Sequence, residues 1–389
     1  MEMKTVHIGD LGEIKTGNTP SKKNPDNYGD YALWIKPTDI NPDEKYTRVV
    51  EEMFSEKAAI DCRSRLIPAK SICVPCIGTV GTKLTMTPCD CFVNQSINAI
   101  IPNDDYDNDY VYYLLLNFLP NLKSINKGTA SGREYIAKSA FENIEIKVHS
   151  DIKVQRIIGK ILSAYDDMID NCKNQIALLE EAAQRLYHEW FVDLRFPGHE
   201  TTPIGENGLP IGWQKLLLST PFTIKYGKNL STKFISNDGK IPVYGASGCI
   251  GYYHTNNVSG YAVLITSRGN SSGRVHRTYH KNSFVTNNSF IVSPKLDYNY
   301  IPLSFIFYSL NNIDLTRFKT GSAQPQLTNA SLYKVEYLLP SNSTLKAFGI
   351  ICDGYLEKIA VLKRIIEQCN YTKSIVLPRL ISGQIEINA

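Results

Sequence analysis

Residues 151–198 carry a hydrophobic repeat that few folds can satisfy. Apolar side chains recur at steps of three and four, which is the spacing of a coiled-coil seam. We assign to this seam the residues Ile158, Ile161, Tyr165, Met168, Cys172, Ile176, Leu179, Ala183, Leu186 and Trp190. No proline interrupts the pattern before Pro197, which Gly198 follows. At about 1.5 Å per residue the pattern predicts a helix roughly 60 Å long, and a helix of that length needs a partner to cover its apolar side.

A second seam of similar length begins at Leu345 and supplies that partner. It comprises Leu345, Phe348, Cys352, Tyr355, Ile359, Leu362, Ile366, Cys369, Val376 and Leu380. Lys373 places a charge on it, and Pro378 predicts a kink or the helix end at that point. The two seams predict a pair of long helices packed together, either parallel or antiparallel. The alternative is two ordinary amphipathic helices, each packed on its own globular core.

The segments that precede the two seams resemble each other in sequence. The matches keep their order along the chain at a spacing of about 190 to 210 residues, which indicates a duplicated unit. They are Ile14-Lys15-Thr16-Gly17 with Ile224-Lys225-Tyr226-Gly227, Gly78 and Gly81 with Gly269 and Gly273, Phe92-Val93 and Pro102 with Phe284-Val285 and Pro294, residues 127–130 with 320–323, and residues 144–148 with 335–339.

The repeat and the seams together predict an α+β fold. We expect two pseudo-repeated globular domains, each a mixed β-sheet with short helices, separated by two long coiled-coil-like helices packed together. The expected boundaries are 1–150 and 199–343 for the globular domains, and 151–198 and 344–389 for the helical regions. Two similar domains on long helices suit a target with two half-sites, and equivalent groove faces of B-DNA recur about every 34–36 Å.

The charge is distributed unevenly between the two globular segments. Residues 1–150 hold 17 Lys and Arg against 20 Asp and Glu, a net charge of −3, although the whole chain carries +4. Residues 200–343 hold 13 against 6, a net charge of +7. The second segment therefore suits a polyanion such as nucleic acid, whereas the first requires a locally basic face.

Composition limits the compartment and the type of site. No apolar run reaches membrane-spanning length, and the first residues lack the apolar core of a secretory signal. The nine cysteines are odd in number and irregularly spaced, which favours reduced thiols and a cytoplasmic protein. Cys73 and Cys76 followed by Cys89 and Cys91 could form a zinc site. However, a C-x-C spacing is tight for zinc, and the matched second segment has Leu264 and Ser267 in place of Cys73 and Cys76.

Motifs for catalysis or cofactor binding are missing from the sequence. It contains no Asn-Pro-Pro-Tyr-like adenine methylation motif, no glycine-rich cofactor loop after a strand and no phosphate loop. Residues 42–45, PDEK, lack the separated carboxylates of a nuclease metal site and are interpreted as a solvated turn. His276 and His280 have one-turn helical spacing but no third ligand nearby. We therefore predict no catalytic, cofactor-binding or metal-binding residues.

Two helical phrases carry a family resemblance. They are LLEEAAQRLYHEWFVDLRFPG at residues 178–198 and LPRLISGQI at residues 377–385. Together with the strand that leads into each long helix, they resemble the specificity subunit of type I restriction–modification systems, and the resemblance covers the whole chain. It implies a non-catalytic subunit whose two target-recognition domains each read one half of a split, asymmetric DNA sequence.

The resemblance also implies partners. Two modification subunits would bind the helices and methylate adenine N6 in each half-site with S-adenosylmethionine. Restriction subunits, which use ATP and Mg²⁺, would join them to translocate and cut unmethylated DNA. No membrane partner is implied. The alternatives are an orphan DNA-binding or scaffold protein without an active methyltransferase, and an enzyme whose catalytic residues the motifs do not reveal.

Polar, basic loops at matched places in the two domains are the predicted DNA contacts. Arg, Lys, Asn and Gln can read base edges, and Lys, Arg and hydroxyl groups bind phosphates. The predicted residues are Lys15, Thr16, Asn18, Thr19, Lys22, Lys23, Lys127, Thr129 and Arg133 in the first domain, and Lys225, Lys228, Lys233, Arg268, Asn270, Arg274, Arg277, Lys319, Gln324 and Gln326 in the second.

The first helical phrase holds more charged and aromatic surface than a two-helix seam can bury. We therefore predict that some of its residues contact the modification subunits, namely among Glu180, Glu181, Arg185, His188, Trp190 and Phe191. For Trp190 the alternative is a place in the core of the helix pair.

Overall fold

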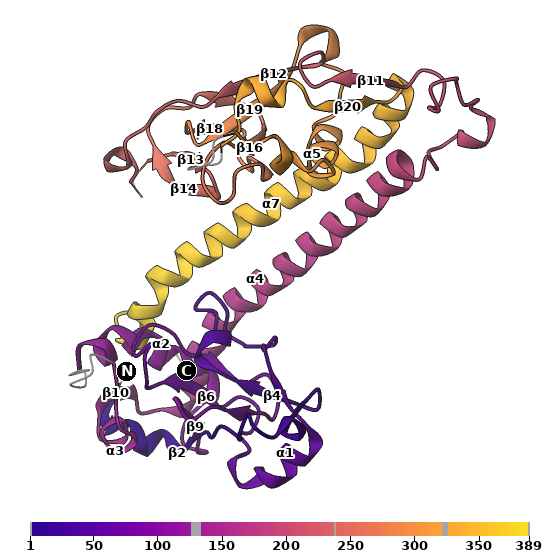
Figure 1. The fold of residues 1–389 in the computed structure, drawn as a ribbon. Coiled ribbons are helices and arrows are strands. Elements are labelled where there is room, and N and C mark those ends of the chain that lie inside the picture. Colours follow the sequence, from indigo (N-terminus) through magenta and orange to yellow (C-terminus); the bar gives the residue numbers. More distant parts are fainter. Residues whose placement is uncertain (1, 126–133, 237–238, 321–325, 388–389) are drawn as a thin grey trace. The chain divides into compact units, whose positions relative to one another are not determined.

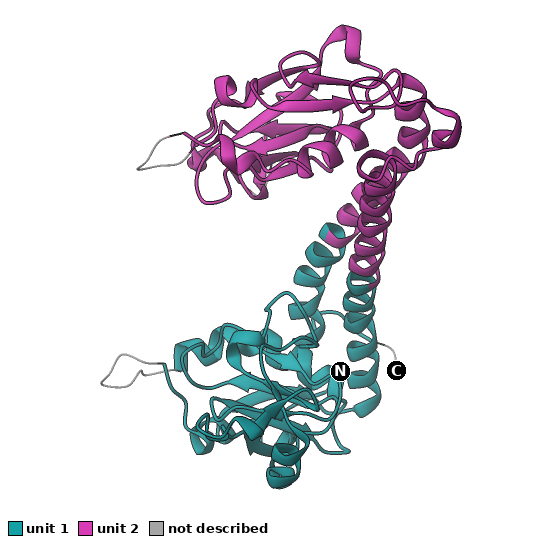
Figure 2. Cartoon of the chain, turned by 45° about the vertical axis from the view of Figure 1, so that its right-hand side comes forward, with its two compact units in different colours: residues 1–170, 367–389 teal, residues 171–366 magenta. Residues whose placement is uncertain are grey.

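The computed structural model describes residues 2–125, 134–236, 239–320 and 326–387. The chain forms two compact units (Figures 1 and 2). Unit 1 comprises Met1–Asp170 and Glu367–Ala389, and unit 2 comprises Asn171–Ile366. The division falls within two long helices, α4 (Ile152–Tyr187) and α7 (Asn342–Ile381), so each helix contributes one stretch to each unit.

The described residues of unit 1 form three small β-sheets and three further α-helices. One sheet pairs β1 (Met3–His7) with β10 (Glu145–His149). A second has the order β2 (Gly12–Thr16), β9 (Ile97–Pro102), β6 (Ile72–Pro75), β7 (Thr85–Met86), and a third has the order β3 (Tyr28–Gly29), β5 (Met53–Phe54), β4 (Ala32–Ile35), β8 (Phe92–Val93). The helices are α1 (Glu56–Asp61), α2 (Asn108–Ile125) and α3 (Lys138–Glu142).

Unit 2 contains the same kinds of sheet. Strand β11 (Gln214–Leu217) pairs with β20 (Glu336–Leu339). One four-stranded sheet has the order β12 (Phe222–Tyr226), β19 (Ser289–Pro294), β16 (Val263–Thr266), β17 (Val275–Arg277), and the other has the order β14 (Gly248–Tyr253), β13 (Ile241–Gly245), β18 (Asn282–Val285), β15 (Val258–Ser259). The further helices are α5 (Leu303–Asn311) and α6 (Asn329–Leu332).

The strand pairing confirms that the two globular segments are copies of one fold. The matched Phe-Val dipeptides occupy the same place, because Phe92 pairs in parallel with Trp34 of β4 and Phe284 pairs in parallel with Val243 of β13. All other pairs between neighbouring strands in these sheets are antiparallel. Each unit therefore contains a mixed sheet with short helices, as the sequence predicts.

The two long helices pack against each other in an antiparallel direction. In unit 1, Leu162 of α4 shares a core with Leu380 of α7, and one turn later Asp166 accepts a hydrogen bond from Lys373. In unit 2, Tyr187 near the end of α4 lies 6.3 Å, ring to ring, from Phe348 near the start of α7. Residue numbers therefore rise along α4 as they fall along α7, which decides between the two directions that the sequence leaves open.

The register of the first seam differs from the predicted one. Ile161 and Met168 are 38% and 47% exposed, whereas the buried positions after Ile158 are Leu162, Asp166 and Ile169. A seam assigned from apolar residues omits Asp166, because a carboxylate rarely lies among buried apolar side chains. Here the carboxylate is buried because Lys373 and Tyr113 both donate hydrogen bonds to it. The second half of the seam, from Cys172 to Trp190, is buried or half-buried as predicted.

The ends of the helices also differ in detail from the prediction. Helix α4 passes into a single π-helical turn, His188–Val192, before the Phe-Pro-Gly segment. Helix α7 continues past Pro378 to Ile381, so the helix end is not at the proline. Among the described residues no helix has both the length and the apolar character needed to cross a bilayer.

Candidate nucleic-acid interface

In unit 1 the predicted DNA-contacting loop, residues 15–23, joins a polar turn at one edge of the β2 sheet. The backbone N–H of Asn18 donates to the carbonyl of Val93 at 3.1 Å, and the Thr19 hydroxyl contacts the side-chain oxygen of Gln95. On the other side of this turn, the N–H of Cys76 donates to the carbonyl of Ser96 at 2.8 Å. Backbone hydrogen bonds thus hold the loop, the turn at residues 94–96 and the segment after β6 in one row.

The row also includes residues 134–136, which follow the second predicted loop of unit 1 in the sequence. The N–H of Gly78 donates to the carbonyl of Glu134 at 2.9 Å, and the N–H of Ile136 donates to the carbonyl of Cys76 at 2.9 Å. Residues 134–136 directly follow the predicted contacts Lys127, Thr129 and Arg133, which lie outside the described residues. We call residues 15–23, 76–81, 94–96 and 134–136 the polar edge of unit 1.

Unit 2 repeats this arrangement with the matched residues. The N–H of Lys228 donates to the carbonyl of Val285 at 3.0 Å, and the N–H of Ser267 donates to the carbonyl of Asn288 at 2.8 Å. The N–H of Leu327 then donates to the carbonyl of Ser267 at 3.0 Å. Residues 225–233, 267–274, 286–288, 319–320 and 326–327 form the polar edge of unit 2, and the predicted contact Gln324 lies outside the described residues.

The repeated Ile-Lys-x-Gly motif has a steric cause. A Cβ atom built on Gly17 would lie 1.9 Å from the carbonyl oxygen of Val93, and one built on Gly227 would lie 2.3 Å from that of Val285. Only glycine lets the chain pass this close to the neighbouring strand. The glycine after β2 and β12 therefore directs each basic loop onto the polar edge of its domain.

In unit 2 most of the predicted DNA contacts are accessible. Lys319 is half-buried, and the exposed set is Lys225, Lys228, Lys233, Arg268, Asn270, Arg274 and Gln326. The Lys233 ammonium lies 4.9 Å from the ring centroid of Phe234. Gln326 exchanges two backbone hydrogen bonds with Thr320. Six of these eight side chains are lysines or arginines, which makes this edge suited to a polyanion.

The predicted contacts of unit 1 are partly engaged with neighbouring groups. Lys15 lies 3.7 Å from Glu13, and Lys22 lies 3.3 Å from Glu52. The Thr16 hydroxyl donates to Asn98, and the Asn18 amide donates to the Cys62 sulfur. Lys23 is exposed. These surface ion pairs are weak and salt-sensitive, so phosphate groups can compete for the lysines.

Arg277 lies in the core and not on the polar edge. Its side chain is among the buried residues at 3% exposure, it donates to the backbone carbonyl of Leu356 at 3.1 Å, and its guanidinium lies 4.9 Å from the ring of Tyr279. Burial lowers the pKa of this guanidinium. Arg277 therefore connects strand β17 to helix α7. Because it is buried, it is no longer a candidate DNA contact.

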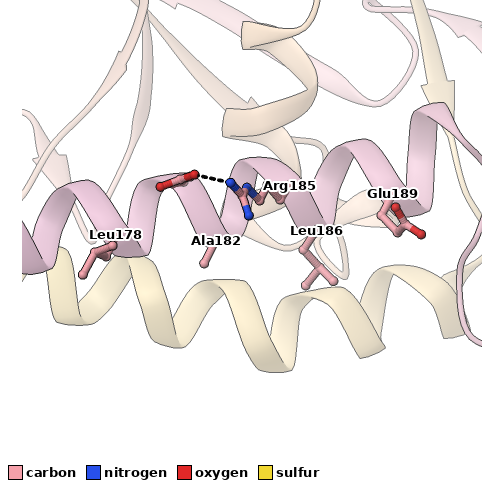
Figure 3. Close-up of a pocket in the computed structure, with 6 residues that line it drawn as sticks. Leu178, Ala182, Arg185, Leu186 and Glu189 are labelled. Atoms are coloured by element: carbon pink, nitrogen blue, oxygen red, sulfur yellow. Dashed lines mark hydrogen bonds and ion pairs between the residues drawn. The ribbon is translucent and has the colours of Figure 1, made fainter.

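The predicted partner-binding residues of α4 divide into two groups. Glu180, Glu181, Arg185 and His188 are exposed, and Glu181 pairs with Arg185 at 2.6 Å beside a shallow groove of about 610 Å³ (Figure 3). Leu178, Ala182, Leu186 and Glu189 also line this groove. Trp190 and Phe191 are instead buried in the core of unit 2, where Trp190 lies 5.9 Å from Phe348. Trp190 therefore lies in the core beside helix α7, as the alternative to a partner contact predicts.

The cysteines of the suggested zinc cluster occupy different environments. Cys73, Cys76 and Cys91 are buried, whereas Cys89 is exposed. Burial raises the pKa of the Cys76 thiol to about 11, so this group is a protonated thiol at neutral pH. Within the described ranges, no three His, Cys, Asp or Glu side chains are grouped so that they could hold a metal ion.

The comparison with known families decides the identity of this fold. The family model described as the type I restriction modification DNA specificity domain matches residues 1–181 and again residues 210–371. The chain belongs to this family. It contributes DNA sequence specificity and carries two copies of the specificity domain, in agreement with the repeat and with the resemblance of the helical phrases.

Individual relatives of the specificity subunit agree with the family model. The MjaIX type I restriction enzyme specificity subunit of Methanocaldococcus jannaschii is 25% identical over 98% of this chain and 93% of its own length. The HindI specificity subunit of Haemophilus influenzae is 35% identical over 44% of this chain and 36% of its own. The crystal structure of a type I S subunit from M. genitalium has the same fold, with a TM-score of 0.67 at 18% identity, covering 100% of this chain and 97% of that one. The family is a DNA-recognition subunit and not an enzyme.

The polar edges of the specificity subunit contain amide side chains that the sequence analysis missed. Asn94 and Gln95 lie in the turn after β8, and Asn287 and Asn288 lie in the turn after β18. Gln95 and Asn288 are exposed. Both turns follow the matched Phe-Val dipeptides, so the repeat itself could have pointed to them. Asn and Gln are the side chains that pair with adenine through two hydrogen bonds.

Proposed function

We propose that the polar edges of units 1 and 2 each read one half of a split, asymmetric DNA sequence. In unit 2 the arginines and lysines at residues 225–233 and 268–274 would hold phosphates, and Asn288, Asn270 and Gln326 would read base edges. In unit 1 the loop at residues 15–23 and Gln95 would do the same, together with Lys127, Thr129 and Arg133. Because the side chains on the two edges differ, the two half-sites differ in sequence.

The observation that supports this proposal is the recurrence of one loop set in both units. In each unit, backbone hydrogen bonds place a basic loop, an amide-bearing turn and a glycine-containing segment in the same order along one sheet edge. Two related recognition sites require the same backbone arrangement with different exposed side chains. Hydrogen bonds from amide and guanidinium groups to base edges can then supply the discrimination between sequences.

We further infer the partners of the subunit. Two modification subunits would bind the long helices and methylate adenine N6 in each half-site, with Glu180, Glu181, Arg185 and His188 among the helix residues that they contact. S-adenosylmethionine would be bound by those subunits, and ATP and Mg²⁺ by restriction subunits that join them. The complex would work in the cytoplasm, on the DNA of the cell. An orphan DNA-binding scaffold is the second candidate, although the family assignment does not favour it.

A base-resolved map of N6-methyladenine, with the gene intact and deleted, tests the proposal. We expect that one motif of two short halves around a fixed gap loses methylation on deletion. An unchanged methylome would refute a role in active modification, and DNA binding by the purified subunit would then test the scaffold alternative.

Substitutions on each edge refine this test. We expect Gln95→Ala to relax the sequence of one half-site and Asn288→Ala to relax the other, because each removes an exposed amide from one edge. Gln368→Ala, an exposed amide on helix α7, is the matched control and should leave both halves unchanged. If Gln95→Ala and Asn288→Ala altered the same half-site, the assignment of one edge to each half would be wrong.

A further inference from the structure

Each long helix contains a glycine that lies against the domain of its own unit. Gly159 is the eighth residue of α4, and Gly349 is the eighth residue of α7. A glycine in a helix interior lowers helix stability relative to alanine, so its recurrence at the same helical position needs a reason other than helix formation.

In unit 2 the reason is contact with the start of helix α5. A Cβ atom built on Gly349 would lie 2.6 Å from Cγ and 2.9 Å from Cβ of Pro302, the residue that precedes α5. One turn further along α7, Asp353 accepts a hydrogen bond from the backbone N–H of Ser304 at 2.9 Å. That N–H belongs to the first turn of α5, where backbone donors have no partner within their own helix. The long helix thus both contacts and caps the short one.

In unit 1 the matched contact is with the start of helix α2. A Cβ atom built on Gly159 would lie 2.6 Å from Oδ1 of Asp107, 3.0 Å from Cβ of Asp109 and 3.0 Å from the backbone nitrogen of Tyr110. One turn earlier on α4, Gln155 is fully buried and accepts a hydrogen bond from the backbone N–H of Asp107 at 3.1 Å. Again the long helix lies against the start of a helix of the domain, and here it accepts a hydrogen bond from the residue that precedes that helix.

The Asp107 carboxylate cannot move away from an added Cβ atom without losing the hydrogen bond by which it caps helix α2. Its Oδ1 accepts a hydrogen bond from the backbone N–H of Tyr110 at 2.9 Å and so caps α2 itself. Nearby, Lys45 donates both to Asp109 of α2 and to Ser163 of α4. The orientation of the domain on α4 is therefore held by several groups, and Gly159 lies in the middle of them. We call the Gly159 and Gly349 contacts the glycine seats.

We propose that Gly159 and Gly349 are positioning residues that fix the angle at which each DNA-reading domain sits on its long helix, and that they thereby determine which gap between the two DNA halves is accepted. This inference rests on the proposed function. A Cβ at 2.6 Å must move by roughly 1 Å to reach ordinary contact distance, and misplacement of that size can change rates by one to two orders of magnitude. The displacement would be carried to the polar edge, because domains are close-packed and transmit strain.

The experiment compares Gly349→Ala and Gly159→Ala with Gly354→Ala, in subunits assembled with their modification subunits. Gly354 lies on the same helix as Gly349, but an added Cβ would have no atom within 4 Å. The readout is the methylation rate on duplexes with the native gap, divided by the rate on duplexes whose gap is one base pair longer or shorter. A general loss of stability lowers both rates together and leaves this ratio unchanged.

We expect the ratio to fall about tenfold for Gly349→Ala, to fall in the same direction but less for Gly159→Ala, and to stay unchanged for Gly354→Ala. If Gly349→Ala does not fold, the double variant Gly349→Ala with Pro302→Gly removes both colliding carbon atoms. That variant should fold with the native ratio, since glycine is tolerated before the first turn of a helix.

Two outcomes distinguish a failure of the proposed function from a failure of the glycine seats. A wild-type complex without any gap preference would overturn the proposed function itself. A wild-type complex with a clear preference, but with Gly349→Ala and Gly354→Ala showing the same ratio, would overturn the glycine seats alone. The same conclusion would follow if the double variant kept the altered ratio of Gly349→Ala.

Discussion

The buried ion pair between Asp166 and Lys373 provides a quantitative test of how the helix pair is held in unit 1. The Asp166 side chain is 11% exposed and that of Lys373 is 19% exposed, and their charged atoms lie 2.5 Å apart. Tyr113 donates a second hydrogen bond to Asp166 at 2.5 Å. Replacing Lys373 by Met keeps most of the apolar stem and removes the charge, which leaves a buried carboxylate with the tyrosine hydroxyl as its described donor.

Removing one partner of a buried pair costs about 3–5 kcal/mol, and the partial exposure of Lys373 points to the lower end, about 3 kcal/mol. Asp166→Asn should cost less, about 1–2 kcal/mol, because the long lysine side chain can turn its ammonium toward water. The double variant should therefore be more stable than the sum of the two losses implies, with a coupling of about 1–2 kcal/mol.

Urea unfolding of the four proteins of this cycle measures the coupling. Lys358→Met is the matched control, since Lys358 is an exposed lysine of the same helix, and it should change stability by less than about 0.5 kcal/mol. Equal unfolding midpoints for Lys373→Met and Lys358→Met would refute the role of the pair. Strict additivity in the double variant would refute the direct interaction.

Three further predictions concern single side chains. Arg274→Ala should weaken DNA binding at low salt and reduce the slope of log affinity against log salt concentration by about 1, as expected for one lost phosphate contact. Binding titrations at several salt concentrations measure this slope. An unchanged slope would exclude a phosphate contact by Arg274. Burial, aided by the nearby Arg274 charge, lowers the pKa of His276 from 6.5 to about 4, so the unfolded chain binds a proton first and the free energy of unfolding should fall by about 2 kcal/mol between pH 7 and pH 5. His276→Asn should lose that part of the pH dependence in urea unfolding, and an unaltered pH dependence would count against a half-buried neutral imidazole. Burial raises the pKa of the Cys73 thiol to about 12, so iodoacetamide at pH 8 should label exposed Cys89 within minutes and Cys73 only after urea is added, as mass spectrometry can establish; equal labelling of both thiols without urea would contradict the burial.

The large features of the fold could be predicted because they are repeated or periodic. The Phe-Val dipeptides at residues 92 and 284 mark the same strand in two copies, and the glycines at 17 and 227 meet the same steric demand. A repeat within one chain acts as an alignment of two sequences, and it separates residues that the fold requires from residues that vary.

Features that depend on a partner far along the chain could not be predicted. Asp166 and Arg277 are charged, and sequence patterns place charged residues at the surface. Each is buried where a group from α7 forms a hydrogen bond with it, namely Lys373 with Asp166 and the Leu356 carbonyl with Arg277. The amide turns at Gln95 and Asn288 were missed for another reason. A short polar turn taken alone resembles an ordinary loop, and only its position after a matched Phe-Val dipeptide distinguishes it.

The membership of residues 367–387 in unit 1 has a consequence for the order in which the chain can fold during synthesis. Leu380 and Ile381 lie in the same core as Ile8 and Tyr110. The Leu380 carbonyl accepts a hydrogen bond from Nε2 of His149 at 2.9 Å. Residues 2–170 are synthesised before unit 2, yet their core includes residues from the segment 367–387, which is synthesised after unit 2. Unit 2 is continuous in sequence and can close beforehand, in contrast to the usual order in which the first domain made is the first to fold. The core of unit 1 can therefore be completed only after residues 367–387 have been made, which follows the synthesis of the whole of unit 2.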